Sequence, residues 1–141
     1  LARAGVRARQ VPSRDDISSV GLLDVLPLRA SKRHAIEALM ETEGFKLRET
    51  VFCGDSGNDL EVLASPIPAV LVANARQEIK QQAVLLAEQA GCKSQLYIAR
   101  GGFLDLNGNY RGGMLEGIAH YHPSVGEWLE RQAVGVAGAL V

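Results

Sequence analysis

The sequence predicts an α/β fold built around a parallel β-sheet. Short apolar stretches alternate with segments that repeat apolar residues at helical spacing, which is the pattern of strands joined by crossover helices. The stretch 69–73 is continuously apolar, as expected for a strand that a parallel sheet buries on both faces. Ligands of such sheets bind at the carboxyl ends of the strands. Polar residues that directly follow a predicted strand are therefore the first candidates for a functional site.

The N-terminal part of the chain predicts only short elements. We expect the end of a helix over residues 1–9, a short strand over 11–13 and a polar turn over 14–19. Residues 21–26 are mostly apolar and predict a second strand, which Pro27 should end.

The next predicted helix has a signal at each end. Ser31 is a good N-cap, and apolar residues follow it at helical spacing as far as Met40. Gly44 should end this helix.

Strands and helices then alternate. The predicted strands are residues 49–53, 69–73 and 95–99, and the predicted helices between them are residues 59–63 and 77–90. Pro66 and Pro68 should stop the first of these helices, and Gly91 should follow the second.

The C-terminal part predicts a loop and two more helices. Residues 101–113 are rich in Gly and Asn, which is typical of a loop. Helices are expected over residues 114–120 and 125–132. The tail, residues 133–141, is small and apolar, and we expect it to be poorly ordered or loosely packed.

The composition is that of a soluble globular protein. The chain has 141 residues, enough for one domain, with 47% apolar and 22% charged residues. Its net charge of -1 argues against steering to nucleic acid or to an anionic membrane. Apolar runs stay far below the roughly 20 residues that span a bilayer. Cys53 and Cys92 match no metal motif, and we expect both to be reduced thiols in a cytoplasmic protein.

Oxygen donors are concentrated in one run, residues 54–59, which reads Gly-Asp-Ser-Gly-Asn-Asp directly after a predicted strand. Its two carboxylates and one amide are hard oxygen ligands of the kind that Mg²⁺ prefers. Gly54 and Gly57 let the backbone bend and approach a bound group. A simple strand-to-helix loop would also use Asp and Asn as caps. The density of acidic and amide groups favours a metal site.

This run and two other stretches resemble a known family. The run followed by an apolar helix resembles the fourth motif of the haloacid-dehalogenase (HAD) phosphatase superfamily. Residues 23–32, which lead from a strand to Lys32, look like the third motif of the branch that hydrolyses sugar phosphates. Residues 108–118 are similar to the tail of sucrose-phosphate and mannosylfructose-phosphate phosphatases. The resemblance covers roughly residues 1–130 and implies the C-terminal half of a HAD-type Rossmann-like sheet with helices on both faces.

The resemblance also implies a division of the chain. Residues 1–26 would be a remnant of an α+β cap, residues 27–132 the C-terminal half of the HAD core, and residues 133–141 a tail. Members of the family begin with a strand that ends in a DxDGT-like motif, whose first aspartate is the nucleophile. The 141 residues contain no DxD. We therefore expect the C-terminal part of a larger protein or a truncated gene product, with the nucleophile on an upstream segment or on a separate chain.

The resemblance gives catalytic roles to three residues. Asp55 would bind Mg²⁺, and Asp59 would bind it directly or through a water. Lys32 would be a buried ammonium that neutralises the nucleophile and the phosphate. A solvated helix lysine is the ordinary alternative for Lys32.

Phosphate binding would involve Lys32 and three further residues. Asn58 would hydrogen-bond the phosphate or a metal-bound water. Ser56 suits this role or that of a loop cap, and Asn74 suits it or that of a cap at the end of a strand.

The implied activity is that of a Mg²⁺-dependent sugar-phosphate phosphatase that acts through an aspartyl-phosphate, with sucrose 6-phosphate or mannosylfructose phosphate as the leading substrates. We expect no nucleic acid or membrane partner, and no more than trace activity from the 141 residues alone. The alternative is a non-catalytic phosphatase-like domain or fragment, such as the C-terminal region of a sucrose-phosphate synthase. An upstream DxDGT motif would favour the enzyme, and an upstream glycosyltransferase would favour the alternative.

Overall fold

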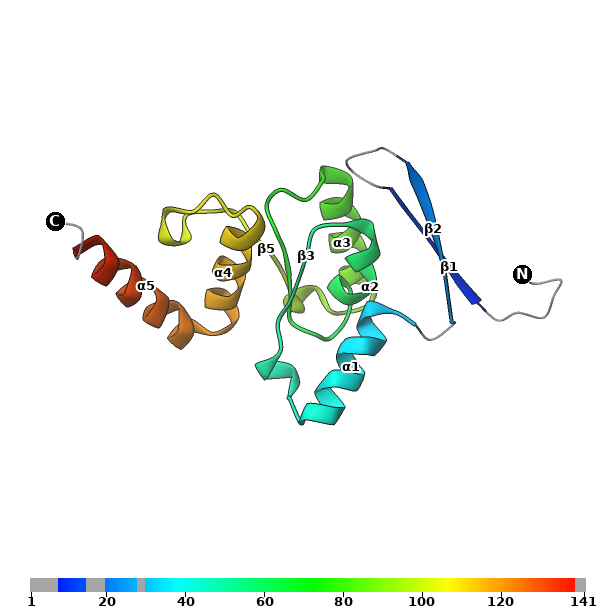
Figure 1. Cartoon of the computed structure of the whole chain (residues 1–141), viewed down its shortest axis with the longest axis horizontal. Coiled ribbons are helices and arrows are strands. Elements are labelled where there is room, and N and C mark those ends of the chain that lie inside the picture. The colour runs from blue at the N-terminus through cyan, green and yellow to red at the C-terminus, as the bar shows by residue number, and fades with distance from the viewer. Residues whose placement is uncertain (1–7, 15–19, 28–29, 139–141) are drawn as a thin grey trace. The chain divides into compact units, whose positions relative to one another are not determined.

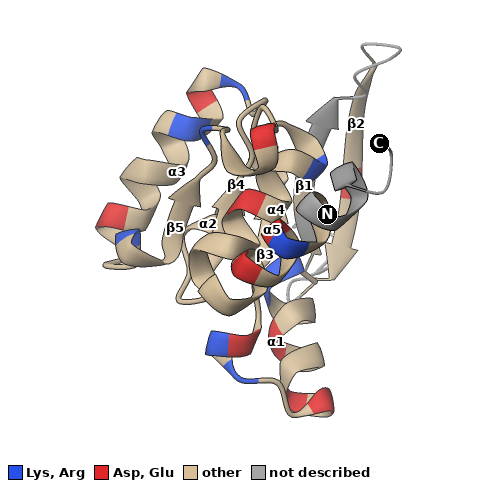
Figure 2. Cartoon of the chain, turned by 90° about the vertical axis from the view of Figure 1, so that its left-hand side faces the viewer, with Lys and Arg blue, Asp and Glu red and all other residues tan. Residues whose placement is uncertain are grey.

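The computed structural model describes residues 8–14, 20–27 and 30–138 (Figure 1). It consists of two compact units, Leu1–Gly44 and Phe45–Val141. Basic and acidic residues are interspersed along the chain (Figure 2), in keeping with its net charge of -1. Within the described ranges, no helix is both long and apolar enough to cross a bilayer.

The first unit begins with a β-hairpin. Strand β1 (Ala8–Arg14) pairs antiparallel with strand β2 (Gly21–Pro27), and Pro27 ends β2 as predicted. Residues 8–9, expected at the end of a helix, are in β1 because their backbone groups pair with β2, so that expectation is wrong for them. Residues 1–7 and most of the predicted turn, residues 15–19, lie outside the described residues. All of β2 is exposed.

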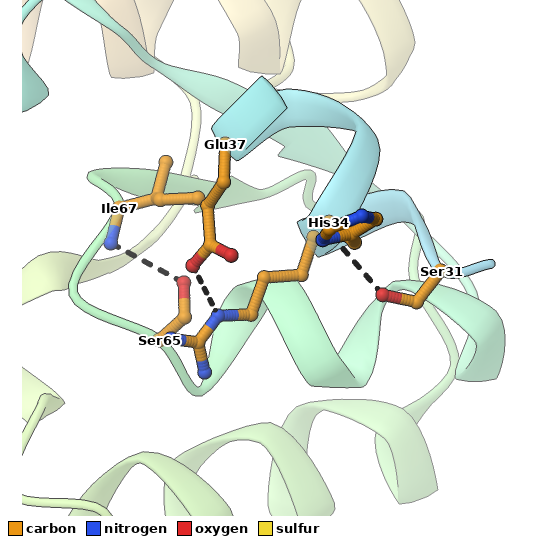
Figure 3. A network of polar contacts seen from close by, with 6 residues as sticks. Ser31, His34, Glu37, Ser65 and Ile67 are labelled. Atoms are coloured by element: carbon orange, nitrogen blue, oxygen red, sulfur yellow. Dashed lines mark hydrogen bonds and ion pairs between the residues drawn. The ribbon is translucent and has the colours of Figure 1, made fainter. Parts of the chain in front are cut away.

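Helix α1 (Lys32–Glu43) has the predicted boundaries. The Ser31 backbone is extended, and its Oγ accepts a hydrogen bond of 3.1 Å from the N–H of His34 (Figure 3). Gly44 follows the helix with a φ of 75°, a left-handed conformation that glycine adopts without side-chain strain. The contacts within the chain group α1 with the hairpin. The predicted division after residue 26 stays a prediction.

The second unit contains a parallel sheet of three strands in the order β3-β4-β5. The strands are β3 (Phe52–Gly54), β4 (Ala69–Leu71) and β5 (Leu96–Ile98), so the described residues include a strand at each of the three predicted places. β3 starts later than predicted because Glu49 belongs to a 3₁₀ turn, where its carboxylate accepts the N–H of Lys46 at 2.9 Å.

Four helices accompany this sheet. They are α2 (Leu60–Leu63), α3 (Gln77–Gln89), α4 (Tyr110–Tyr121) and α5 (Pro123–Gly138). α3 matches the prediction closely, and Gly91 after it has a φ of 68°. α4 begins within the predicted loop 101–113, and α5 continues beyond Gln132, so both predicted boundaries are wrong. The extension of α5 makes most of the predicted tail helical, and residues 139–141 lie outside the described residues.

One face of the sheet packs on α2 and α3. Ala69 and Leu71 of β4 are fully buried and form a core cluster with Leu63 of α2 and Ala83 of α3. Successive side chains of a strand point to opposite faces, so the residues between and after these two belong to the other face.

The opposite face packs on α4. Val70 is fully buried, and a Cβ atom added at Gly117 would lie only 2.2 Å from its Cγ2 atom. A Cβ atom at Gly113 would lie 3.0 Å from Cβ of Val72. The two glycines, one helical turn apart, let α4 lie directly against the sheet. Helices therefore cover both faces of the sheet, as expected (Figure 1).

Candidate active site

The loop between β3 and α2 is organised around one buried carboxylate. Asp59 is only 3% exposed, and its Oδ2 atom accepts the backbone N–H of Asp55 at 3.0 Å and that of Ser56 at 3.1 Å. The loop closes tightly on the end of β3, where a Cβ atom at Gly54 would lie 2.7 Å from Cγ of Asp59. A side chain at Gly54 would push Asp59 out of place. The glycine and the aspartate of the motif thus form one unit that fixes the backbone at Asp55.

Ser56 and Asn58 complete this loop. The Ser56 hydroxyl lies 2.7 Å from Oδ1 of Asn58 and 3.0 Å from Oδ2 of Asp59, and its single proton can be donated to one of them at a time. These contacts fit the role of a loop cap, one of the two considered for Ser56, and its contact with a phosphate stays a prediction. Asn58 is exposed, and its contact with a phosphate stays a prediction.

The two carboxylates of the motif differ in their exposure to solvent. Asp59 is buried and engaged with the loop backbone, whereas the side chain of Asp55 is exposed directly after β3. In the parts of the chain that the structure describes, no group of three or more His, Cys, Asp or Glu side chains could hold a metal ion. A metal at this loop would take only part of its ligands from these residues. That suits Mg²⁺, which binds through one or two carboxylates and completes its shell with waters and phosphate oxygens.

The carboxyl end of β4 is tied to two later segments. The N–H of Ala73 donates to the carbonyl oxygen of Gly108 at 2.9 Å, and the Nζ atom of Lys80 donates to the carbonyl oxygen of Ala73 at 2.7 Å. Oδ1 of Asn74 accepts the N–H of Tyr110 at 2.8 Å. Asn74 therefore caps the first turn of α4 across the sheet edge. Its contact with a phosphate stays a prediction.

Lys32 lies in the first unit, as the first residue of α1. Its side chain is exposed, so the burial expected for its ammonium is not observed in this chain. Its role toward a phosphate stays a prediction.

A second buried carboxylate, Glu116, was not singled out from the sequence. Glu116 is 7% exposed; its Oε1 atom accepts the Tyr97 hydroxyl and the Arg100 N–H, and its Oε2 atom accepts the Gly101 N–H, each at 2.8 Å. Burial raises the pKa of Glu116, but these hydrogen bonds and the Arg100 charge outweigh it, so the pKa is lowered. Burial and the hydrogen bond to Glu116 raise the pKa of Tyr97 to about 12.

The sequence did contain a signal for this carboxylate. Glu116 stands directly before Gly117, in a helix whose glycines at positions 113 and 117 mark the face that packs on the sheet. A glutamate beside such a face is a candidate for burial.

Three further side chains of this unit, those of Cys53, His120 and Tyr121, contribute to packing or to fastening the helices. Burial raises the pKa of the Cys53 thiol to about 11, which keeps it protonated and unreactive near neutral pH. The His120 ring stacks on Tyr97 with a centroid distance of 4.1 Å. The Tyr121 hydroxyl lies 2.7 Å from the carbonyl oxygen of Gln95 and 3.2 Å from that of Ala69, which fastens α4 to β4 and to the turn that precedes β5.

Comparison with known proteins gives a consistent set of relatives. The family model of sucrose-6F-phosphate phosphohydrolase matches residues 1–122. A putative HAD-like hydrolase of Nitrosococcus oceani is 51% identical over 132 residues, which are 92% of this chain and 35% of that protein. Sucrose-phosphatase 2 of Nicotiana tabacum is 43% identical over 63 residues, which are 42% of this chain and 15% of that protein.

A solved structure also matches. The sucrose-phosphatase of Synechocystis, determined in complex with sucrose and phosphate, aligns with a TM-score of 0.60 and 26% identity, over 85% of this chain and 42% of that one. The chain thus spans less than half the length of each of these relatives.

Proposed function

Because the chain belongs to the sucrose-6F-phosphate phosphohydrolase family of the HAD superfamily, we propose that it supplies the metal-binding half of a Mg²⁺-dependent sugar-phosphate phosphatase. The observation that carries this proposal is the loop after β3. Buried Asp59 fixes the backbone of Asp55 and Ser56, and the Asp55 carboxylate is left exposed at the sheet edge where ligands of parallel sheets bind.

In this proposal the two carboxylates have distinct tasks. Asp55 would hold the metal, and when bound, Mg²⁺ would neutralise charge on the phosphoryl oxygens. Asp59 would act mainly by keeping the loop in shape, because its Oδ2 atom already accepts two backbone N–H groups.

The other proposed residues bind or neutralise the phosphate. The Asn58 amide would donate a hydrogen bond to its oxygens, and the Ser56 hydroxyl would do so after turning its single proton away from Asn58 and Asp59. Lys32 would offset the negative charge of the phosphate. The attacking group would be an aspartate outside these 141 residues, since they contain no DxD. Its attack on phosphorus would break the ester bond, the sugar oxygen would take up a proton and leave as a hydroxyl group, and the aspartyl-phosphate that remains would be hydrolysed by water.

We propose sucrose 6-phosphate as the first substrate to test and mannosylfructose phosphate as the second. The family model and the Synechocystis enzyme, whose structure contains sucrose and phosphate, support the first of these substrates, and the resemblance of residues 108–118 supports the second.

Two measurements test the proposed function. Mass spectrometry of the natural protein in its source cell would show whether a DxDGT segment is on the same chain or on a co-purifying one. Phosphate release from both sugar phosphates would then be compared between that natural protein and the 141 residues alone. We expect Mg²⁺-dependent turnover by the natural protein and no more than trace activity from the 141 residues. A natural protein with no nucleophile segment and no turnover would overturn the proposal in favour of a non-catalytic domain.

A further inference from the structure

The segment that leads from β5 into the first residue of α4, residues 100–110, is held at both ends by side chains from elsewhere in the second unit. We call it the edge loop. At its start, the carboxylate of Glu116 accepts two successive backbone N–H groups, those of Arg100 and Gly101. At its end, Asn74 accepts the N–H of Tyr110, and Gly108 accepts the N–H of Ala73. The loop is therefore fastened over the ends of both β4 and β5.

The edge loop is strained as well as fastened. Leu104, Asp105 and Tyr110 have φ values of 52°, 57° and 43°, in the left-handed region that is unfavourable for residues other than glycine. Such strain persists only where surrounding contacts hold the backbone in place, and it is concentrated at functional sites. A loop that only connected β5 to α4 could avoid this cost.

The edge loop starts on the same side of the sheet as the Asp55 loop. β3, β4 and β5 are parallel, so their carboxyl ends meet at one edge. Asp55 follows β3 and the edge loop follows β5, two strands away. At the usual spacing of about 4.8 Å between strands, these strand ends are about 10 Å apart. A phosphate bound at Asp55 would thus have the edge loop within reach of the organic group it carries.

The side chains of the edge loop suit a sugar. Tyr110 is 67% exposed, and Asn107, three residues earlier, is exposed as well. Sugars are bound by aromatic faces and by amides, which match their C–H surfaces and their hydroxyl groups. The exposed guanidinium of Arg100 adds a hydrogen-bond donor at the start of the loop.

We propose that the edge loop contacts the sugar part of a sugar-phosphate substrate, and that Glu116 is the positioning residue that holds the loop for this contact. This inference rests on the proposed function, because it takes the phosphate to bind at Asp55. Glu116 lies on α4 and acts through the backbone of the loop.

The first test is Glu116→Gln in the natural protein that carries this chain. Gln keeps the size and one acceptor, but its NH₂ group would face one of the two backbone N–H groups. We expect kcat/KM for sucrose 6-phosphate to fall about tenfold, mainly through KM, because a shift in the loop removes sugar contacts. For p-nitrophenyl phosphate, which has no sugar, the change should stay below about twofold. Tyr97→Phe removes only the third hydrogen bond and should leave both substrates within about twofold.

An equal loss on both esters would show that Glu116 is merely structural, and no loss on either would show that it is dispensable. Both results would overturn the proposal.

A second test works without catalysis or mutation. Backbone NMR of the natural protein would be recorded with Mg²⁺ and either inorganic phosphate alone or inorganic phosphate together with sucrose, a pair that the enzyme cannot hydrolyse. We expect both samples to shift the amides of the Asp55 loop and only the sample with sucrose to shift those of the edge loop. Shifts confined to the Asp55 loop with both probes would overturn the edge-loop proposal and leave the proposed function standing. A lack of any shift at the Asp55 loop would count against the proposed function itself.

Discussion

The substitution Asp59→Ala tests whether Asp59 holds the backbone of the loop after β3, a role distinct from the metal binding proposed for Asp55. The substitution removes the acceptor of two backbone N–H groups, those of Asp55 and Ser56, at a side chain that is 3% exposed. A donor left without an acceptor in a buried site costs about 1–3 kcal/mol. Water can reach the exposed side of this loop and recover part of that cost. We expect the free energy of unfolding to fall by about 2–4 kcal/mol.

The matched control is Asp55→Ala, in the same loop and with the same loss of a carboxylate. The Asp55 side chain is exposed, so its removal should change the free energy of unfolding by no more than about 0.5 kcal/mol. It should instead remove Mg²⁺ binding. Urea denaturation followed by circular dichroism gives the first quantity, and isothermal titration with MgCl₂ gives the second. The reasoning is refuted if Asp59→Ala unfolds at the same urea concentration as the wild type, or if the two variants lose equal stability.

Three further predictions follow from the second unit. Gly117→Ala should destabilise it by about 1–2 kcal/mol, because the new Cβ atom must move about 1.2 Å from its 2.2 Å approach to buried Val70 to reach ordinary contact. Gly112→Ala, on the same helix, would bring its Cβ atom only to 3.1 Å from Cβ of Leu106 and should cost less. An unchanged urea midpoint for Gly117→Ala would contradict the close packing of α4. Burial raises the pKa of the Cys53 thiol from 9.0 to about 11, so at about pH 8 it should react with iodoacetamide roughly a hundredfold more slowly in the native protein than in urea. Peptide mass spectrometry measures the two rates, and equal rates would show that the thiol is not buried. The pKa of Glu116 is lower in the folded protein than its unfolded value of 4.5, so the ionised carboxylate contributes stability at pH above 4.5. This contribution is lost as pH falls from 4.5 through the folded pKa. The Tm of the wild type should therefore drop more steeply below pH 4.5 than the Tm of Glu116→Gln, and parallel curves would contradict this.

The elements that the sequence predicted well are those whose signals are local. Ser31 and Gly44 fix the ends of α1 through their own side chain and backbone, and the apolar run 69–73 contains the buried strand β4. The loop after β3 was also recognised locally, because its glycines and oxygen donors follow one another directly in the chain.

The features that the sequence did not predict depend on distant residues. α4 starts at Tyr110 because Asn74, 36 residues earlier in the chain, caps it. The sequence made Asp55 the first candidate ligand and Asp59 a direct or water-mediated one, but the burial of Asp59 against Gly54 became visible only in the structure. Glu116 was missed because its partners, Tyr97 to Gly101, are at least 15 residues away.

The measurement that tests the central claim most directly is Mg²⁺-dependent phosphate release from sucrose 6-phosphate by the natural protein and by its Asp55→Asn variant. Asn has nearly the same size as Asp and lacks the charge, so the fold should be kept while metal binding is lost. We predict turnover by the wild type that EDTA abolishes, and a fall in kcat/KM of at least about a hundredfold for Asp55→Asn. Turnover that is unchanged in Asp55→Asn would contradict the assignment of this loop as the metal-binding half of a phosphatase.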